Sequence, residues 1–272
     1  MDDLFSIEGK NIVITGGAGV LGGEMSRACA RRGARLCILD YDVMRADKLC
    51  QEIQTEGHTA IPIQSDVLDK RKIQEAFSCA LESLGSIDVL INAAGGNKKE
   101  ATCSAPTTFF ELPPDALHDV FNLNCLGAFL PCQVFGRYMA QQKHGVIINI
   151  ASMNAFRPLT NIAAYSAAKA AVANFTQWLA TYMAQRHSPN IRVNAVAPGF
   201  FLTKQNRFLI IDENTGEFTP RGQTILEHTP MARLGEPQDL IGALIWLISD
   251  AAKFVTGTII PIDGGFSAFS GV

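Results

Sequence analysis

The sequence predicts an α/β fold with one open, doubly wound parallel sheet and helices on both of its faces. Short runs rich in Val, Ile and Leu alternate with longer segments of helical spacing, as in successive βα units. The apolar runs are nearly continuous, which is typical of strands that helices cover on both sides. About seven strands are expected, at residues 11–15, 35–40, 60–64, 87–92, 145–151, 191–196 and 258–262.

We expect a single domain that spans residues 1–272. With 272 residues, 47% of them hydrophobic, the chain is long enough to bury one substantial core. No Ser/Gly tract, charge block or internal repeat marks a domain boundary. The stretch 199–235 is irregular, and long connections in compact domains are often binding loops, so we expect a substrate loop or lid there.

Charge and composition favour a small-molecule ligand. The net charge of −3 gives no basic excess for binding nucleic acid or an anionic membrane. No basic flank or long apolar run precedes Lys10, and the apolar stretch 240–248 is far shorter than the ~20 residues of a membrane span. The seven cysteines contain no C-x-x-C pair. We therefore expect a cytoplasmic protein without a metal site.

A glycine turn follows the first expected strand. Strand 11–15 runs directly into this turn, and helical spacing resumes at Glu24. Glycines let the backbone approach a pyrophosphate, whose charge the free N–H groups of the next helix bind. This is the arrangement of a Rossmann-type nucleotide-binding domain, and the residues expected to contact the cofactor here are Gly16, Gly17, Gly19, Val20, Leu21 and Gly22.

Asp40 ends the second expected strand, 18 residues after Gly22. A carboxylate about 20 residues beyond the glycines accepts hydrogen bonds from the adenosine ribose. The same carboxylate would repel a 2′-phosphate, so NAD is favoured over NADP. Arg45 is the nearest downstream cation and leaves NADP open as the less favoured cofactor.

Further motifs, in order along the chain, resemble the short-chain dehydrogenase/reductase family from about residue 7 to 265. Thr15-Gly16 with Gly22 resembles the family's glycine signature, although Val20 occupies the place of its middle glycine, so Gly17, Gly19 and Gly22 read as G-x-G-x-x-G. The other matching motifs are Asp66-Val67, Asn92-Ala93-Ala94-Gly95, Asn124, Ser152, Tyr165-Ser-Ala-Ala-Lys169 and Pro198-Gly199 with Thr203.

The resemblance implies a role for each motif. Asp66 and Val67 would contact the adenine, 92–95 would support the sheet beside the cofactor, and Pro198, Gly199 and Thr203 would hold the nicotinamide end. Asn124, Ser152, Tyr165 and Lys169 would be catalytic, and Tyr165 and Lys169 would also contact the cofactor. Most of the family are homotetramers, and the segments 105–140 and 152–183 are apolar on more than one face, so we expect a homotetramer.

Tyr165 and Lys169 suit proton transfer, because residues four apart share one face of a helix. A free phenol has a pKa of about 10. We expect the ammonium of Lys169 and the positive nicotinamide ring to lower the pKa of Tyr165. Tyr165 would then exchange a proton with the substrate oxygen, Ser152 would hold that oxygen, and Asn124 would order a water beside Lys169.

The loops at the predicted mouth, 95–103, 153–161 and 200–222, are rich in amides and cations. Such groups bind the hydroxyls and carboxylate of a sugar acid. The residues expected to contact substrate are Asn97, Ser152, Asn154, Arg157, Gln205 and Arg207.

Several stretches, among them 92–97, 198–207, 228–233 and 254–268, are similar to the D-mannonate oxidoreductases of this family, also called fructuronate reductases. The resemblance implies hydride transfer between a nicotinamide cofactor and the D-mannonate/D-fructuronate pair. The alternatives are a gluconate 5-dehydrogenase or polyol dehydrogenase and, from a different class, a catalytically silent nucleotide-sensing protein.

Overall fold

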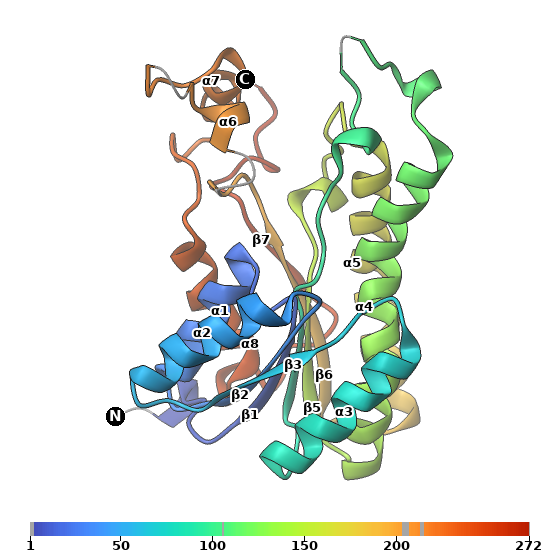
Figure 1. Ribbon diagram of the computed structural model, residues 1–272, viewed down its shortest axis with the longest axis vertical. Coiled ribbons are helices and arrows are strands. Elements are labelled where there is room, and N and C mark those ends of the chain that lie inside the picture. Colours follow the sequence, from blue (N-terminus) through green and yellow to red (C-terminus); the bar gives the residue numbers. More distant parts are fainter. Residues whose placement is uncertain (1–2, 105, 203–206, 213–214, 272) are drawn as a thin grey trace.

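The computed structural model describes residues 3–104, 106–202, 207–212 and 215–271 (Figure 1). Its centre is a seven-stranded sheet in the order β3-β2-β1-β4-β5-β6-β7, and every neighbouring pair is parallel. The predicted fold class is therefore confirmed. The strands are β1 (Asn11–Thr15), β2 (Arg35–Asp40), β3 (Ala60–Gln64), β4 (Val89–Asn92), β5 (Gly145–Ile150), β6 (Ile191–Pro198) and β7 (Ile259–Ile262).

Helices cover both faces of the sheet. On one side lie α1, α2 and α8, and on the other α3, α4 and α5 (Figure 1). None of the helices among the described residues is long and apolar enough to cross a membrane. The helices are α1 (Val20–Ala30), α2 (Val43–Thr55), α3 (Lys70–Leu84), α4 (Pro114–Gln142), α5 (Ala163–Arg186), α6 (Arg207–Ile210), α7 (Pro220–Glu227) and α8 (Ile241–Ile248). Short 3-10 turns are η1 (Asp3–Phe5), η2 (Lys99–Ala101), η3 (Phe109–Glu111), η4 (Met153–Ala155), η5 (Pro237–Leu240) and η6 (Asp250–Ala252).

Strand alternation divides the interior into two cores. In β1, Ile12 and Ile14 pack with α1, α2 and α8, whereas Val13 belongs to the core beneath α3, α4 and α5. Successive side chains of a strand point to opposite faces. A strand that is apolar on both faces therefore fits only between two helical layers, which is why the near-continuous apolar runs predict this architecture.

The strand ends differ from expectation by a residue or two. The strand expected at 87–92 begins at Val89, and the one expected at 191–196 continues to Pro198. The two others that differ, expected at 145–151 and 258–262, end at Ile150 and begin at Ile259. The ends of a strand are set by ladder hydrogen bonds, which apolar composition does not report.

The segment 199–235 contains more regular structure than its sequence pattern suggests. Its described part includes α6 and α7. Helix α7 begins after Thr219, whose side chain accepts a hydrogen bond from the backbone N–H of Gly222 at 3.1 Å, and Pro220 occupies the first helical position. A threonine cap followed by proline is a helix-start signal. This signal is present in the sequence, but the irregular pattern of apolar residues in the segment did not indicate a helix. The role of the segment as a lid stays a prediction.

The order of the strands creates a crevice at one edge of the sheet. Strand β1 pairs with β2 on one side and with β4 on the other. The chain therefore crosses from β3 over β2 and β1 to begin β4, and the connections leave β1 and β4 toward opposite faces. In open parallel sheets, ligands bind outside the carboxyl ends of strands at such a switch point.

Phe135 tests the core beneath α4. Its side chain is completely buried and meets Phe77 edge to face at a centroid distance of 5.4 Å. We expect Phe135→Ala to lower the free energy of unfolding by about 3–5 kcal/mol, because it leaves a cavity. Urea unfolding measures this loss. Phe110→Ala, at a site that is 89% exposed, is the control and should change the value by less than about 0.5 kcal/mol.

Candidate active site

The turn between β1 and α1 has room only for glycine at two positions. Gly16 has a φ of +61°, and a Cβ there would lie 2.6 Å from Cα of Ala94. A Cβ on Gly22 would overlap the carbonyl oxygen of Gly16. Gly17 and Gly19 leave slightly more space than Gly16 and Gly22, since the nearest atoms to a Cβ there would lie 3.0 and 3.2 Å away. The turn thus brings bare backbone to the crevice.

The first turn of α1 is free to bind an anion. Gly19 is its N-cap residue and has no side chain to occupy the first N–H groups of the helix, which Val20 begins. These groups and the helix dipole favour negative charge. The glycine turn and the uncapped helix end together fit the pyrophosphate of a dinucleotide.

Asp40 lies at the end of β2 beside this turn. Its Oδ2 accepts a hydrogen bond from the backbone N–H of Ala18 at 3.1 Å, and its Oδ1 accepts one from that of Asp42 at 3.1 Å. Arg45 donates from Nη2 to the carbonyl oxygen of Ala18 at 3.2 Å. Asp40 and Arg45 therefore both bond the backbone of Ala18.

The predicted adenine pair follows β3. Asp66 accepts a hydrogen bond from the backbone N–H of Leu68 at 2.9 Å, which stabilises the turn after the strand. Val67 is buried against α4, where a Cβ on Gly127 would lie 3.0 Å from its Cγ2. Both residues lie at the same edge of the sheet as the glycine turn.

Asn92 at the end of β4 belongs to a polar network in the interior. Its Nδ2 donates to Oδ1 of Asn149 at 2.9 Å and to Sγ of Cys132 at 3.2 Å. Asn149 in turn donates to Oγ1 of Thr176 on α5 at 2.9 Å. The network ties β4 to β5 and α5. Ala93 and Ala94 donate to Thr15, which holds the segment 92–95 against β1.

The predicted catalytic residues come together beyond the ends of β4 and β5. Ser152 follows β5, and Tyr165 and Lys169 lie on the first turns of α5. The side chain of Ser152 lies close enough to that of Tyr165 to act on its pKa. The Nζ of Lys169 lies 5.6 Å from the centre of the Tyr165 ring and donates to the carbonyl oxygen of Ile150 at 2.7 Å.

Asn124 holds the loop after β4. Its Oδ1 accepts a hydrogen bond from the N–H of Gly96 at 3.1 Å, while its Nδ2 donates to the carbonyl oxygens of Gly96 and Val120 at 2.6 and 2.8 Å. A Cβ on Gly95 would lie 2.7 Å from Oδ1 of Asn124 and 3.3 Å from Nζ of Lys169. Gly95 therefore marks the point where this loop meets the predicted catalytic residues.

The protein's own groups shift the pKa of Tyr165 upward, opposite to the direction expected with Lys169 and a nicotinamide ring beside it. Burial raises the pKa of Tyr165 above its usual value, and the nearby side chain of Ser152 only partly opposes this. Burial also lowers the pKa of Lys169 to about 8. The ammonium is thus less firmly charged than its position in the sequence suggests, and it does not outweigh the desolvation of the phenol.

The predicted substrate residues are only partly assembled. Asn97 is exposed and donates to Oγ1 of Thr102 at 2.9 Å, whereas Asn154 is buried next to Ser152. Arg157 donates from Nε to the carbonyl oxygen of Ser267 at 3.1 Å. Arg207 is exposed at the start of α6. Gln205, and the predicted cofactor residue Thr203, lie outside the described residues.

The segment after β7 contacts the predicted nicotinamide segment, although no site residue is predicted there from the sequence. The N–H of Gly199 donates to the carbonyl oxygen of Ile262 at 2.9 Å, and a Cβ on Gly199 would lie 2.6 Å from Cα of Asp263. Asp263 accepts hydrogen bonds from the N–H groups of Gly265 and Ser267 at 2.9 Å each. The rule that ligands gather beyond strand ends applies to β7 as well. It would have identified Asp263.

A small cavity supports this placement. It has a volume of about 180 Å³, and Phe200, Phe201, Asp263 and Gly264 are among the residues that line it. Within the described part of the chain, no three His, Cys, Asp or Glu side chains gather closely enough to hold a metal ion.

A doubly wound parallel sheet with this glycine turn, next to a serine and a Tyr–Lys pair at the strand ends, is the arrangement of a nicotinamide-dependent oxidoreductase. Residues 16–267 match the family model described as enoyl-(acyl carrier protein) reductase. The chain belongs to the short-chain dehydrogenase/reductase family, and it is an NAD(P)-dependent oxidoreductase of that family.

Three relatives show how far the likeness extends. An uncharacterised oxidoreductase named UxuB from Bacillus subtilis (strain 168) is 43% identical over 98% of each chain. A solved structure, described as a candidate D-mannonate oxidoreductase from Haemophilus influenza with bound NAD, is 44% identical over 98% of each chain, with a TM-score of 0.92. The 5-keto-D-gluconate 5-reductase of Escherichia coli (strain K12) is 37% identical over 97% of this chain and 98% of that protein.

The buried Lys169 leads to a prediction about stability and pH. Its pKa falls from 10.5 to about 8 on folding, so between these values the unfolded chain binds more protons, and stability rises with pH across this window. Lys169→Met removes that titration. The free energy of unfolding of the variant, relative to the unsubstituted chain, should therefore fall by about 2 kcal/mol between pH 7.5 and 9.5. Urea unfolding of both proteins at the two pH values measures this, and a difference that stays constant would contradict it.

Proposed function

We propose that this chain transfers a hydride between NAD and a secondary alcohol or ketone of a sugar acid, with D-mannonate and D-fructuronate as the substrate pair. The observation that carries the reaction is the cluster of Ser152, Tyr165 and Lys169 beside the glycine-lined crevice. The substrate is supported by the 44% identity to the D-mannonate oxidoreductase candidate over almost the whole chain. The amides and cations of the mouth loops are chemically consistent with a polyhydroxylated acid.

The protein's own residues supply the proton transfer. In reduction, Tyr165 donates its phenolic proton to the carbonyl oxygen of the substrate, and in oxidation it accepts the alcohol proton there. The hydroxyl of Ser152, which lies near that of Tyr165, holds the same oxygen. Bound nicotinamide supplies or accepts the hydride, and its positive oxidised ring favours the phenolate.

Lys169 and Asn124 arrange the surroundings of this step. We assign Lys169 to the ribose next to the nicotinamide, because its Nζ lies beside the segment 92–95 and is held by the carbonyl oxygen of Ile150. Asn124 fixes the loop at Gly96 through two hydrogen bonds with its backbone. The adenine end is assigned to Asp66 and Val67, and the nicotinamide end to Pro198, Gly199 and Thr203.

The main rival is a gluconate 5-dehydrogenase, which the 37% identity to the 5-keto-D-gluconate 5-reductase favours. A polyol dehydrogenase would use the same Ser–Tyr–Lys cluster, and a nucleotide-sensing protein would bind the cofactor without turnover. The test is a panel of D-mannonate, D-gluconate and uncharged polyols, with NADH formation followed by its absorbance. We expect the highest kcat/KM with D-mannonate. A higher value with D-gluconate or a polyol, or no turnover despite cofactor binding, would contradict the proposal.

Asp40 underlies the proposed choice of NAD. Because its carboxylate is held beside the backbone of Ala18, where it would repel a 2′-phosphate, we expect NADH to bind at least about tenfold more tightly than NADPH. Asp40→Ala should reduce the difference between the affinities for NADH and NADPH, since Arg45 still bonds the backbone of Ala18. Fluorescence titration at fixed ionic strength measures both affinities. Comparable affinities in the unsubstituted protein would refute the assignment.

Tyr165→Phe tests the proton transfer. The variant keeps the aromatic ring but loses the hydroxyl, so we expect kcat to fall by about 10²–10⁴-fold while NAD binding changes little. Lys169→Ala should in addition weaken NAD binding. Retention by Tyr165→Phe of more than a tenth of kcat would contradict the role, provided that a deuterated substrate shows hydride transfer to be rate-limiting.

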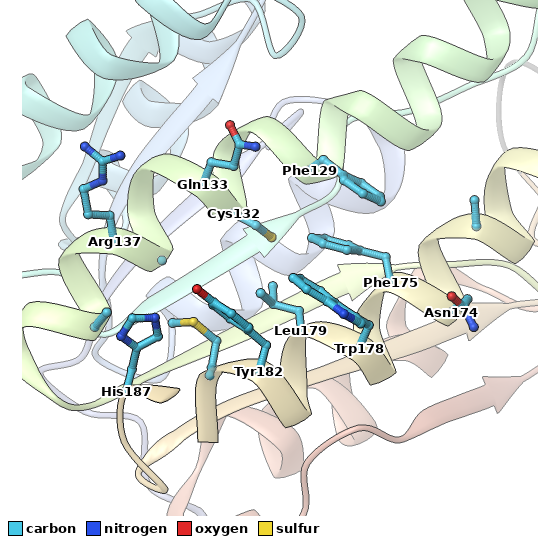
Figure 2. Close-up of a pocket in the computed structure, with 14 residues that line it drawn as sticks. Phe129, Cys132, Gln133, Arg137, Asn174, Phe175, Trp178, Leu179, Tyr182 and His187 are labelled. Atoms are coloured by element: carbon cyan, nitrogen blue, oxygen red, sulfur yellow. The ribbon is translucent and has the colours of Figure 1, made fainter. Parts of the chain in front are cut away.

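We also propose that the protein is a homotetramer. Support comes from a groove of about 740 Å³ between α4 and α5, shown in Figure 2. Four aromatic rings, those of Phe129, Phe175, Trp178 and Tyr182, stack in succession along it, and Trp178 and Tyr182 remain 56% and 40% exposed. An exposed apolar groove of this kind suits a matching groove of a second copy. Sedimentation equilibrium at micromolar concentration would overturn the proposal if it found a monomer.

We propose a cytoplasmic location as well. Each of the seven cysteines, all of which lie among the described residues, is a free thiol, and burial raises the pKa of Cys29 and Cys132 to about 12. Free thiols are typical of reducing compartments.

A further inference from the structure

Buried polar atoms without a partner gather at the functional edge of the sheet. Within the described residues, four side-chain atoms are buried and make no hydrogen bond, namely Oγ of Ser65, Oδ1 of Asn92, Oδ1 of Asn154 and Oγ of Ser166. They lie after β3, at the end of β4, after β5 and next to Tyr165. An unpaired buried polar group lowers stability, so each such group in a native protein calls for an explanation.

Asn154 is the most unusual of the four. Its residue is only 4% exposed, and no hydrogen bond from the described residues reaches its side-chain amide. Ser65 and Ser166 each leave one hydroxyl unpaired, and Asn92 still uses its Nδ2. Asn154 leaves both amide atoms without a partner among the described residues, and of the two only Oδ1 is buried. An amide offers both donors and acceptors, so the side chain of Asn154 has the capacity to form further hydrogen bonds.

The position of Asn154 relates this capacity to the reaction. Its backbone N–H donates to Oγ of Ser152 at 3.2 Å. Asn154 is therefore one hydrogen bond away from the hydroxyl that, in the proposed function, holds the reacting oxygen of the substrate. A group next to that oxygen meets the substituents of the neighbouring carbon atoms.

We propose that Asn154 determines specificity by hydrogen-bonding a hydroxyl group on a carbon next to the reacting one. This inference rests on the proposed function and deepens it. The Nδ2 of Asn154, which is not among the four unpaired buried atoms, can donate a hydrogen bond to such a hydroxyl. A carboxylate would favour a cation, and an apolar substituent would leave the amide unpaired.

The proposal predicts that the amide of Asn154 serves substrate binding and not the stability of the fold. If the amide serves the substrate, its loss costs the folded protein nothing, because no protein group loses a partner. Asn154→Leu, an apolar replacement of similar shape, should then fold with an unchanged or higher Tm. A residue with a structural role would lower Tm on the same substitution.

The experiment compares substrates with and without the neighbouring hydroxyl. D-mannonate and D-gluconate, oxidised at C5, are each assayed beside their 4-deoxy and 6-deoxy analogues. We expect Asn154→Leu to lower kcat/KM for the parent acid by about tenfold to a hundredfold, while at least one deoxy analogue changes by less than about threefold. Ser166→Ala is the matched control, because it removes another unpaired buried atom and should not change the ratio of parent to analogue.

Two results would overturn the role of Asn154. One is an equal loss of kcat/KM on the parent and on both analogues, and the other is a clear fall in Tm for Asn154→Leu. Failure of the proposed function looks different, because it appears in the unsubstituted protein, which then prefers D-gluconate or a polyol, or oxidises neither acid. When D-gluconate is preferred, the comparison of D-gluconate with its deoxy analogues still tests Asn154. The remaining case is an unsubstituted protein that oxidises neither acid. In that case 2,3-butanediol and 2-butanol replace the acids. Equal effects of Asn154→Leu on these two alcohols, or oxidation of neither, would then count against Asn154.

Discussion

The parallel direction of all seven strands is the constraint on which the rest of the structure depends. It forces every connection to cross the sheet through a helix, and it brings all seven carboxyl ends to one edge. The proposed site is assembled from successive strand ends for this reason. In spatial order these ends contribute Asp66 after β3, Asp40 on β2, the glycine turn after β1, Asn92 on β4, Ser152 after β5, Pro198 on β6 and Asp263 after β7. Residues distant in sequence become neighbours without any long loop having to fold back.

A second consequence is that the edge of the sheet formed by the carboxyl ends of the strands is polar, although it borders an apolar interior. The network of Asn92, Asn149 and Thr176 satisfies most of the groups there, and Lys169 is held by the carbonyl oxygen of Ile150. Burial of these groups costs stability, and the hydrogen bonds offset part of that cost. The two apolar cores on either side of the sheet supply the compensating stability. The edge can therefore retain unpaired groups that a purely structural surface would not tolerate.

Sequence reasoning predicted the architecture and the chemical centre, and it failed where contacts between distant segments decide. The apolar runs identified all seven strands, because burial on both faces leaves a direct trace in composition. The spacing of Tyr165 and Lys169 identified one face of a helix. The protein's own groups raise the pKa of Tyr165, because it is buried by segments that no local spacing reveals. Asp263 follows the last expected strand, so the strand-end rule does reach it. The bond of Arg157 to the backbone of Ser267, 110 residues away in sequence, has no such local trace.

The segment after β7 has a practical consequence for handling the protein. It packs against Gly199 and accepts a hydrogen bond from Arg157. The carbonyl oxygen of Gly264 accepts another from the N–H of Met231. Three separate segments of the chain therefore contact its last stretch. The first turn, η1, is exposed and lies at the opposite end of the molecule (Figure 1). An affinity tag or fluorescent fusion therefore belongs on the N-terminus, away from the contacts that the segment after β7 makes with the proposed site.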